Sequence, residues 1–369
     1  MKNDFILRLK GAYLELTSEC NASCPYCYNE SNSQNKDFLP LENVLEIIDE
    51  LSISDFPAIV LSGGEPFLYP YISQILNYAW EKRVKPTIIT NGMLLSCDRI
   101  VSLLQRDVSI QLTFDSIIST EHNKTRGVGN FEKLIEILSI AHTESHEDKL
   151  MIRYNINKQN YDHVDSFIDF LKGYGIHAAT FSFLHKTGRA KNFPLVFDYY
   201  EDSLLLYRIL QNFRAKEVEY AEKKDFSISY GDLDHVLGCA YFADGKIDSS
   251  PRIDAKGNVY PCQVFTGDEN SLGNIVVEHS LHRILESTLC HNVIERIRDR
   301  KSKLKDKCVR CPYDNFCMGG CPAMAYNSTG NLYTVDKQCY FIKFCFKNNY
   351  NTIEKNTKKV EKQSEDCVF

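Results

Sequence analysis

The sequence predicts an α/β fold in which a parallel, barrel-like sheet is followed by a smaller cysteine-rich domain. Strand-like and helix-like segments alternate through the first half of the chain at the spacing of βα units. Most of the 14 cysteines stand in two blocks, one near the N-terminus and one in the last third. Because 369 residues exceed the usual size of one domain, we expect two domains.

Six short, largely apolar segments are the predicted strands, and they cover residues 13–17, 58–62, 86–90, 110–114, 151–156 and 178–183. Amphipathic helices are expected between them. Two of these helices show apolar residues at i, i+3, i+4, i+7 spacing, at Phe131, Leu134, Ile135 and Leu138 and at Val164, Phe167, Ile168 and Leu171. Six βα units imply a functional site at the C-terminal ends of the strands.

The first cysteine block places Cys20, Cys24 and Cys27 directly after the first predicted strand. Three thiolates can hold three irons of a [4Fe–4S] cluster, which leaves the fourth iron open to a non-protein ligand. A structural zinc site is the alternative, but it needs a fourth protein ligand, and no second cysteine or histidine pair follows before Cys97. The spacing therefore favours an iron–sulfur cluster.

This CxxxCxxC spacing resembles that of the radical S-adenosylmethionine (radical SAM) superfamily. The resemblance implies that Cys20, Cys24 and Cys27 are the catalytic cluster ligands and that the open iron chelates S-adenosylmethionine. The reduced cluster would then cleave this cofactor to a 5′-deoxyadenosyl radical. The resemblance also implies a partial (β/α)6 barrel, and it places Tyr26 beside the adenine.

The second predicted strand ends in a tight turn that contains Gly63, Gly64, Glu65 and Pro66. Two glycines allow the backbone to approach a ligand closely, and Glu65 adds a carboxylate at the strand end. The turn resembles the GGEP motif of the family, which meets the amino group of S-adenosylmethionine. Taken alone, these residues are also compatible with any strand-ending turn.

Polar residues follow the later strands where the family places cofactor contacts, at Asn91, Thr113, Asp115 and Asn157. Ordinary turn and helix-cap chemistry explains such residues equally well. Arg126 stands in a segment that resembles a recurrent family loop, and it is expected to pair with a carboxylate of the cofactor or peptide, although a solvated arginine fits as well. The dipeptide Gly188-Arg189 resembles another family loop.

The second block contains Cys308, Cys311, Cys317, Cys321 and Cys339, downstream of Cys239 and Cys262. This pattern resembles the SPASM domain of radical SAM enzymes that modify peptides and proteins. The resemblance implies an outer auxiliary cluster on Cys308, Cys311, Cys317 and Cys339 and an inner one on Cys239, Cys262 and Cys321. The inner cluster then lacks a fourth thiolate, so a substrate thiolate, a remaining cysteine or an oxygen ligand such as Asp244 is expected to complete it. Two zinc sites are the alternative.

Four cysteines remain, namely Cys97, Cys290, Cys345 and Cys367. Singly, each is expected to be a small buried residue or an idle thiol, although Cys345 and Cys367 stand close enough to the second block to be ligands. We expect the barrel domain at residues 1–230, the SPASM domain at residues 231–345 and a poorly packed tail at residues 346–369.

The composition and the N-terminal sequence argue against two classes of binding partner, nucleic acids and membranes. A net charge of −6 gives no footprint for nucleic-acid binding. The N-terminus lacks the apolar core of a signal peptide, and no run of ~18 apolar residues is present to span a bilayer. We therefore expect a cytoplasmic protein that binds neither nucleic acid nor membrane. It would use an external electron donor such as flavodoxin or ferredoxin, and leader-peptide recognition would use this chain or a separate protein.

These features together predict a radical SAM/SPASM peptide maturase that oxidatively modifies a ribosomally made peptide. Thioether cross-linking to a peptide cysteine is the favoured product. Carbon–carbon cross-linking, formylglycine formation as in sulfatase maturases, and epimerisation are alternatives within the enzyme class. A non-catalytic iron–sulfur electron carrier or a zinc scaffold is the alternative from another class, and a barrel carrying Glu65 argues against it.

Overall fold

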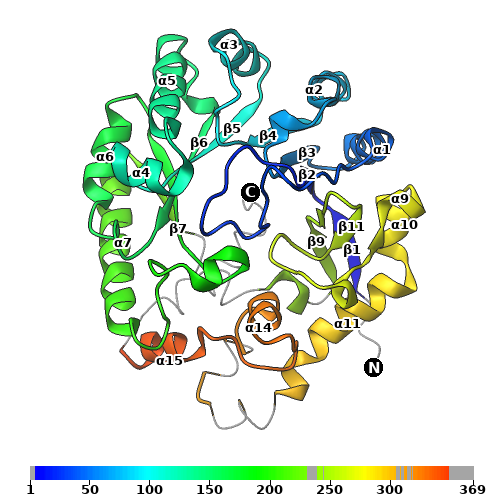
Figure 1. Cartoon of the computed structure of the whole chain (residues 1–369). Coiled ribbons are helices and arrows are strands. Elements are labelled where there is room, and N and C mark those ends of the chain that lie inside the picture. The colour runs from blue at the N-terminus through cyan, green and yellow to red at the C-terminus, as the bar shows by residue number, and fades with distance from the viewer. Residues whose placement is uncertain are drawn as a thin grey trace.

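The computed structural model describes residues 5–230, 239–243, 245–304, 308, 311–313, 317 and 319–348. Its centre is a ten-stranded sheet with the strand order β12-β11-β10-β2-β3-β4-β5-β6-β7-β8. Strands β2 to β8 are parallel neighbours. They curve around the centre of the molecule, with helices outside them (Figure 1). The predicted α/β class with a barrel-like parallel sheet is confirmed.

All six predicted strands are present, and no end differs from the prediction by more than one residue. They are β2 (Ala12–Thr17), β3 (Ala58–Gly63), β4 (Lys85–Ile89), β5 (Ser109–Phe114), β6 (Leu150–Ile156) and β7 (Ala178–Phe183). A seventh parallel strand, β8 (Ser227–Tyr230), extends the sheet beyond β7. Apolar periodicity thus located the strands well, because their outward residues are buried.

Helices connect the parallel strands. They are α1 (Leu41–Ser52), α2 (Ile72–Glu81), α3 (Cys97–Gln105), α4 (Ser119–Arg126), α5 (Asn130–Thr143), α6 (Val164–Lys172) and α7 (Ser203–Lys223). The buried face of α6 is the predicted one. In α5, Ile137 and Ala141 are buried beside Leu134 and Leu138, whereas Phe131 and Ile135 are half-buried. The core-facing stripe of α5 is therefore rotated slightly from the predicted one.

The two faces of the parallel sheet differ in chemistry because side chains alternate between them. Outward residues such as Leu14, Leu112 and Phe181 are buried in the hydrophobic core. We call the opposite side, which faces the centre of the barrel, the inner face. Several polar residues there are only half-buried, among them Thr87, Gln111, Thr113, Arg153 and Thr180. Solvent therefore reaches a polar surface inside the barrel.

The C-terminal third continues the barrel sheet. Strand β10 (Arg252–Ile253) pairs in parallel with β2, and β11 (Asn258–Tyr260) and β12 (Gly273–Asn274) follow as antiparallel neighbours. A separate pair joins β1 (Ile6–Leu9) to β9 (Lys246–Ser249). The two domains were expected to meet between residues 230 and 231. In the structure they share one sheet, so they are not two domains with independent cores.

The helices of this C-terminal part are α9 (Ile275–Glu278), α10 (Leu281–Glu286), α11 (Thr288–Lys303), α14 (Pro322–Thr329) and α15 (Cys339–Lys347). The tail predicted over residues 346–369 begins inside α15, and its residues from 349 onward lie outside the described part of the chain. None of the helices in the described ranges combines the length and apolar character that a bilayer span requires.

Replacing Phe167 with alanine tests the packing of helix α6 on the sheet. The Phe167 ring is fully buried and stacks on Tyr154 with ring centroids 4.2 Å apart. We expect Phe167→Ala to lower the free energy of unfolding by about 3–5 kcal/mol, measured by urea titration. Trp80→Ala, at a site that is 66% exposed, is the control and should stay within about 0.5 kcal/mol of the parent. Equal losses in both variants would contradict this packing.

Candidate functional site

The three cysteines of the first block lie together on the segment that follows β2, which we call the cysteine loop (residues 18–40). Cys20, Cys24 and Cys27 are half-buried there, and the loop crosses the front of the barrel in Figure 1. Burial raises the pKa of the Cys20 thiol to about 12, and the nearby thiols of Cys24 and Cys27 add to the rise. Such thiols become thiolate ligands when a metal displaces their protons. The donor set fits a cluster with three protein ligands.

Arg189, after β7, fastens the cysteine loop to the far side of the barrel. Its backbone N–H donates to the Cys27 carbonyl at 3.1 Å, and its Nε donates to the Cys24 carbonyl at 2.9 Å. Gly188 has φ +49°, and a Cβ there would lie 2.4 Å from the Tyr28 carbonyl oxygen. The Gly188-Arg189 pair therefore supports the loop by close approach and three hydrogen bonds, the third being to the carbonyl of Ser31 at 3.0 Å.

Gly63 and Gly64 bring the end of β3 against the same loop. A Cβ on Gly64 would lie 2.0 Å from the Glu19 carbonyl oxygen, and the Gly64 N–H donates to the Thr17 carbonyl at 2.6 Å. Gly63 has φ +120°, in the region that favours glycine. In the structure these glycines bring β3 against the chain's own backbone next to Cys20, and their approach to a ligand stays a prediction. Pro66 then opens a short 3₁₀ turn.

The Glu65 carboxylate is fully buried and is bonded to the end of the neighbouring strand. Its Oε1 accepts from the Thr90 hydroxyl at 2.7 Å and from the Phe67 N–H at 3.3 Å. Its Oε2 accepts from the Asn91 N–H at 2.9 Å. Burial raises the pKa of Glu65, and these donors oppose the rise. Glu65 thus orders the turn after β4, and its contact with a cofactor stays a prediction.

The predicted cofactor contacts on the other strand ends differ in what already binds them. Asn91 donates from Nδ2 to Asn21 Oδ1 at 2.8 Å, with Cys20 Sγ 4.0 Å away, so its side chain is tied to the cysteine loop. Asn157 is buried, and its Oδ1 accepts a backbone N–H two residues later at 2.8 Å, as a turn residue does. Thr113 is half-buried on the inner face. Of these three residues, Asn91 is the one whose side chain bonds to the cysteine loop.

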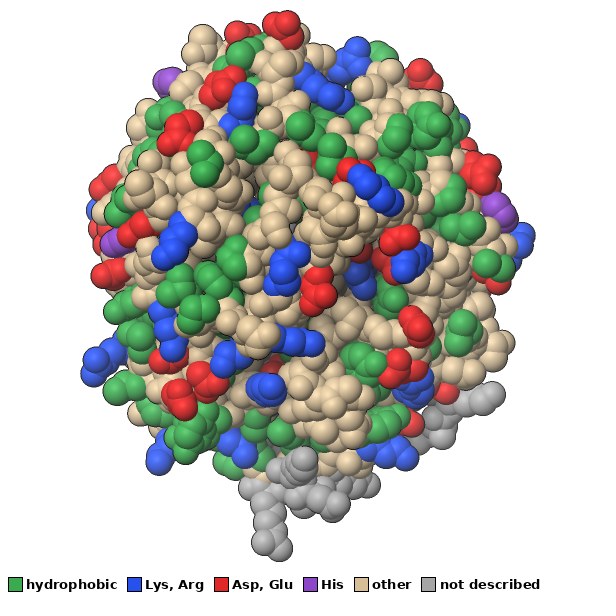
Figure 2. Space-filling view, in the orientation of Figure 1, with side chains coloured by type: hydrophobic (Ala, Val, Ile, Leu, Met, Phe, Trp, Pro, Cys, Tyr) green, Lys and Arg blue, Asp and Glu red, His purple; other side chains and the backbone are tan. Residues whose placement is uncertain are grey.

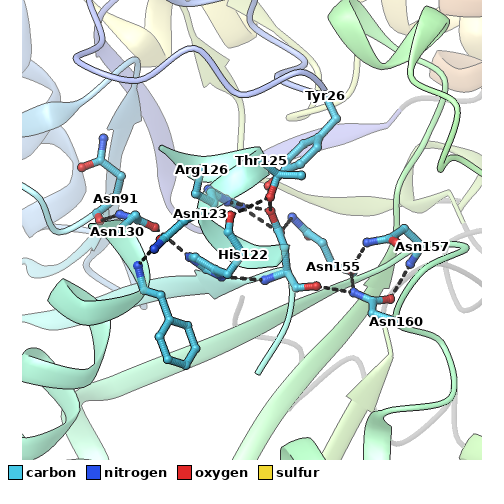
Figure 3. A network of polar contacts seen from close by, with 12 residues as sticks. Tyr26, Asn91, His122, Asn123, Thr125, Arg126, Asn130, Asn155, Asn157 and Asn160 are labelled. Atoms are coloured by element: carbon cyan, nitrogen blue, oxygen red, sulfur yellow. Dashed lines mark hydrogen bonds and ion pairs between the residues drawn. The ribbon is translucent and has the colours of Figure 1, made fainter. Parts of the chain in front are cut away.

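Asp115 is the centre of a buried polar network, shown in Figure 3. Its carboxylate accepts from the Tyr26 hydroxyl, from Thr125 Oγ1 at 2.6 Å, from Arg126 Nε at 3.1 Å and from Asn155 Nδ2 at 3.2 Å. Burial opposes ionisation, but Arg126 and the other donors outweigh it and lower the pKa of Asp115. The Arg126 guanidinium also lies 5.3 Å from the centre of the Tyr26 ring. The network therefore fixes the Tyr26 side chain of the cysteine loop and holds Arg126 beside it.

His122 extends this network back to the end of β4. Its Nδ1 accepts the backbone N–H of Asp115 at 3.2 Å, so the neutral ring donates from Nε2 to Asn130 Oδ1 at 2.8 Å. Asn130 in turn donates to the Asn91 carbonyl at 2.7 Å. Sequence reasoning missed His122 and Asn130. The available signal was the position of His122 one helical turn before Arg126 in α4.

The four cysteines predicted to hold the outer auxiliary cluster surround one small cavity. Cys308, Cys311, Cys317 and Cys339 all line it. Burial raises the pKa of Cys317 to about 11, and the thiols of Cys339 and Cys308 contribute to the rise. Four thiols around one cavity are a donor set that fits a [4Fe–4S] cluster.

The three cysteines predicted to hold the inner cluster are also neighbours. Burial raises the pKa of Cys321, and the thiols of Cys262 and Cys239 add to the rise. Among the possible fourth ligands, Cys290 and Cys345 are buried in the hydrophobic core. Cys367 and Asp244 lie outside the described residues, and Cys97 is exposed and donates to Glu136. Within the described ranges, no group of three or more His, Cys, Asp or Glu side chains is arranged to hold a single metal ion.

A second buried network, which sequence reasoning also missed, joins the cysteine loop to the C-terminal part. Glu15 Oε1 accepts from Arg252 at 3.0 Å and from the Tyr28 hydroxyl at 3.1 Å. Arg252 also donates to the Phe265 carbonyl at 2.7 Å. Because Glu15 lies on β2 and Arg252 on β10, the pair ties the added strands to the barrel. The signal in the sequence was a glutamate inside an otherwise apolar strand.

Replacing His122 with glutamine tests the neutral ring in the Asp115 network. Burial lowers the pKa of His122, so protonation favours the unfolded chain. The stability that the neutral ring provides is present above the ordinary histidine pKa of about 6.5 and is lost as the pH falls below it. We expect the parent to lose more free energy of unfolding than His122→Gln between about pH 7.5 and about pH 5.5. Identical pH profiles would show that the ring is not buried in its neutral form.

Comparison with known proteins identifies relatives along most of the chain. The chain is 25% identical over 337 residues to the antilisterial bacteriocin subtilosin biosynthesis protein AlbA of Bacillus subtilis (strain 168), covering 88% of this chain and 70% of AlbA. It is 27% identical over 351 residues to the AdoMet-dependent heme synthase of Methanosarcina barkeri (strain Fusaro / DSM 804), covering 89% of this chain and 95% of the synthase.

The fold is shared with native anSMEcpe, which was solved with AdoMet and the Cp18Cys peptide bound. The two structures superpose with a TM-score of 0.72 at 17% identity, over 96% of this chain and 99% of anSMEcpe. The radical SAM superfamily pattern matches residues 14–171, and the pattern of the SPASM iron-sulfur cluster-binding domain matches residues 247–312. The chain is therefore a radical SAM superfamily enzyme with a C-terminal SPASM domain.

Proposed function

We propose that this enzyme is a peptide maturase that oxidatively modifies a ribosomally made peptide. One observation supports the proposal most strongly. The loop with three cysteines lies beside the Asp115 network, and two further sets of neighbouring cysteines lie in the C-terminal part. The likeness to AlbA, a bacteriocin biosynthesis protein, and the fold shared with a peptide-bound structure support a peptide substrate.

Cys20, Cys24 and Cys27 are the proposed protein ligands of the first cluster, and S-adenosylmethionine is the proposed cofactor beside them. When bound and reduced, this cluster supplies the electron that cleaves S-adenosylmethionine to a 5′-deoxyadenosyl radical. The chain's own contribution is to hold the three thiols on a loop whose backbone is fixed by Arg189 and by Gly64. This rigid loop sets where the cofactor can sit.

The side chains around the cysteine loop are proposed to orient the cofactor. Tyr26 presents a ring fixed by Asp115, and Arg126 keeps a full positive charge there because Asp115 is ionised beside it. The side-chain amide of Asn91 is hydrogen-bonded to the cysteine loop. Thr113 and Asn157 are proposed contacts of the cofactor farther from this loop. The turn after β3 is also proposed to bind the cofactor. It is formed by Gly63, Gly64, Glu65 and Pro66.

The C-terminal part is proposed to hold two auxiliary [4Fe–4S] clusters within residues 231–345. Cys308, Cys311, Cys317 and Cys339 would hold the outer one, because they surround one cavity. Cys239, Cys262 and Cys321 would hold the inner one. Such clusters can accept the surplus electron of an oxidative reaction, and an external donor such as flavodoxin or ferredoxin would reduce the first cluster.

Thioether cross-linking of a peptide cysteine is the proposed product, with carbon–carbon cross-linking, formylglycine formation and epimerisation as alternatives. A second candidate is chemistry on a porphyrin, which the 27% identity to a heme synthase favours. The two candidates differ in the substrate that the inner face of the barrel must accept. A separate protein that recognises a leader peptide is compatible with the first candidate alone.

Replacing Cys20, Cys24 and Cys27 together with alanine tests the first cluster. We expect the reconstituted parent to hold about twelve irons and the triple variant about eight, because only one of three clusters is lost. The variant should form no 5′-deoxyadenosine when reduced with dithionite in the presence of S-adenosylmethionine. Cys97→Ala, at an exposed thiol, is the matched control and should keep both properties. Retained cofactor cleavage in the triple variant would remove the assignment.

Mass spectrometry of a modified peptide tests the proposed product. The probes are synthetic peptides encoded by the short open reading frames beside the gene, and iron coproporphyrin III is the porphyrin probe. A thioether predicts a peptide that has lost two hydrogen atoms and whose cysteine no longer reacts with iodoacetamide. A modified peptide without a sulfur–carbon bond would contradict the thioether, and turnover of the porphyrin alone would contradict the peptide function.

A further inference from the structure

The inner face of the barrel carries polar side chains that the protein itself does not use. Thr87, Gln111, Thr113, Arg153 and Thr180 project from four adjacent strands, β4 to β7, and all are half-buried. In the described part of the chain, none of these five side chains has a hydrogen bond or an ion pair. Half-buried polar side chains need hydrogen-bond partners, because leaving them unpaired costs free energy. Water or a bound ligand must supply them here.

Arg153 is the cation of this surface. It lies on β6 between Thr113 on β5 and Thr180 on β7, which are its direct neighbours in the sheet register. Two residues later on the same face, Asn155 bonds to Asp115, so Arg153 lies one step deeper in the barrel than the Asp115 network. Burial raises the pKa of Tyr13 on β2, and the Arg153 guanidinium opposes that rise, so its charge reaches across the barrel.

The carboxylates around this surface are already paired with other groups. Glu15 pairs with Arg252 at 3.0 Å, and Asp115 pairs with Arg126 at 3.1 Å. Both oxygens of Glu65 accept from the turn after β4. No carboxylate among the described residues therefore neutralises Arg153. A half-buried guanidinium without a counter-ion favours a ligand that brings one.

We propose that Arg153, with the hydroxyl of Thr180 beside it, binds a carboxylate of the substrate. The inference rests on the proposed peptide function, and it adds that the peptide presents an Asp or Glu side chain, or its C-terminal carboxylate, inside the barrel. A guanidinium binds a carboxylate through two parallel hydrogen bonds, and the Thr180 hydroxyl at its side can donate to the same oxygens. Arg153 is thus a specificity-determining residue.

The same chemistry fits the propionate groups of a porphyrin, and the cofactor's own carboxylate is a third possible partner. These three sources of the carboxylate predict different behaviour of the Arg153 variants. A substrate carboxylate leaves substrate-free cofactor cleavage unchanged when Arg153 is replaced. A cofactor carboxylate makes that cleavage require more S-adenosylmethionine. The test below therefore measures both substrate selection and substrate-free cleavage.

The test selects peptides from a random displayed library on immobilised, reconstituted enzyme with S-adenosylmethionine present. Parent enzyme, Arg153→Gln, Arg153→Glu and the control Arg208→Gln, at an exposed arginine on α7, are compared. We expect the parent and the control to enrich acidic residues or a free C-terminus at one position. Arg153→Gln should lower that enrichment ~10-fold or more, and Arg153→Glu should replace it with Lys or Arg. Half-saturation of substrate-free 5′-deoxyadenosine formation should be unchanged in all four proteins.

Several outcomes would overturn the proposal. A parent pool without acidic enrichment, or one that Arg153→Gln selects equally well, removes the carboxylate site. A rise in the S-adenosylmethionine concentration needed by Arg153→Gln assigns the residue to the cofactor instead. Iron coproporphyrin III, titrated against the same proteins by its absorbance, separates the two functions. Binding that Arg153→Gln abolishes, together with a parent peptide pool showing no selection, would overturn the peptide function and leave Arg153 as an anion site for porphyrin.

Discussion

One close approach of backbone to backbone sets the geometry of the whole site. The end of β3 lies so near the start of the cysteine loop that a Cβ on Gly64 would be 2.0 Å from the Glu19 carbonyl oxygen. Cys20 is the next residue of the loop, and Glu65 is the next residue of the turn. Glu65 binds the Asn91 N–H, and the Asn91 amide returns to the loop at Asn21. The cysteine positions are thereby tied to two strand ends through main-chain packing, which tolerates little movement.

Among the described residues, the inner face carries the charges of two structural ion pairs and of Arg153, which has no ion-pair partner. The pair of Glu15 and Arg252 joins the barrel to the C-terminal strands, and the pair of Asp115 and Arg126 holds the aromatic ring next to the cysteines. Removing one member of such a buried pair leaves an uncompensated charge, so both pairs are costly to disrupt. Arg153 has no such partner among the described residues, which is why substrate recognition is the role that remains for it.

Sequence patterns predicted the local features of this protein and missed the long-range ones. Strand ends were located to within a residue because burial imposes a regular period on the apolar residues of strands and helices. The spacing of the cysteines also predicted which thiols the structure brings together. The contact of Glu15 with Arg252 spans 237 residues, so no local pattern contains it. The contact of Gly64 with the backbone of Glu19 was not predicted either, because spacing alone does not tell which atoms fill the space beside a glycine. The shared sheet likewise depends on pairing between β2 and β10, which are distant in sequence.

The central claim is that S-adenosylmethionine binds directly to a cluster held by Cys20, Cys24 and Cys27. Electron paramagnetic resonance of the reduced enzyme, recorded with and without S-adenosylmethionine, tests it most directly. The account predicts that the cofactor changes the signal of one cluster only, since the auxiliary clusters are held elsewhere by Cys308, Cys317 and their neighbours. A spectrum that S-adenosylmethionine leaves unchanged in fully reconstituted, reduced enzyme would contradict it.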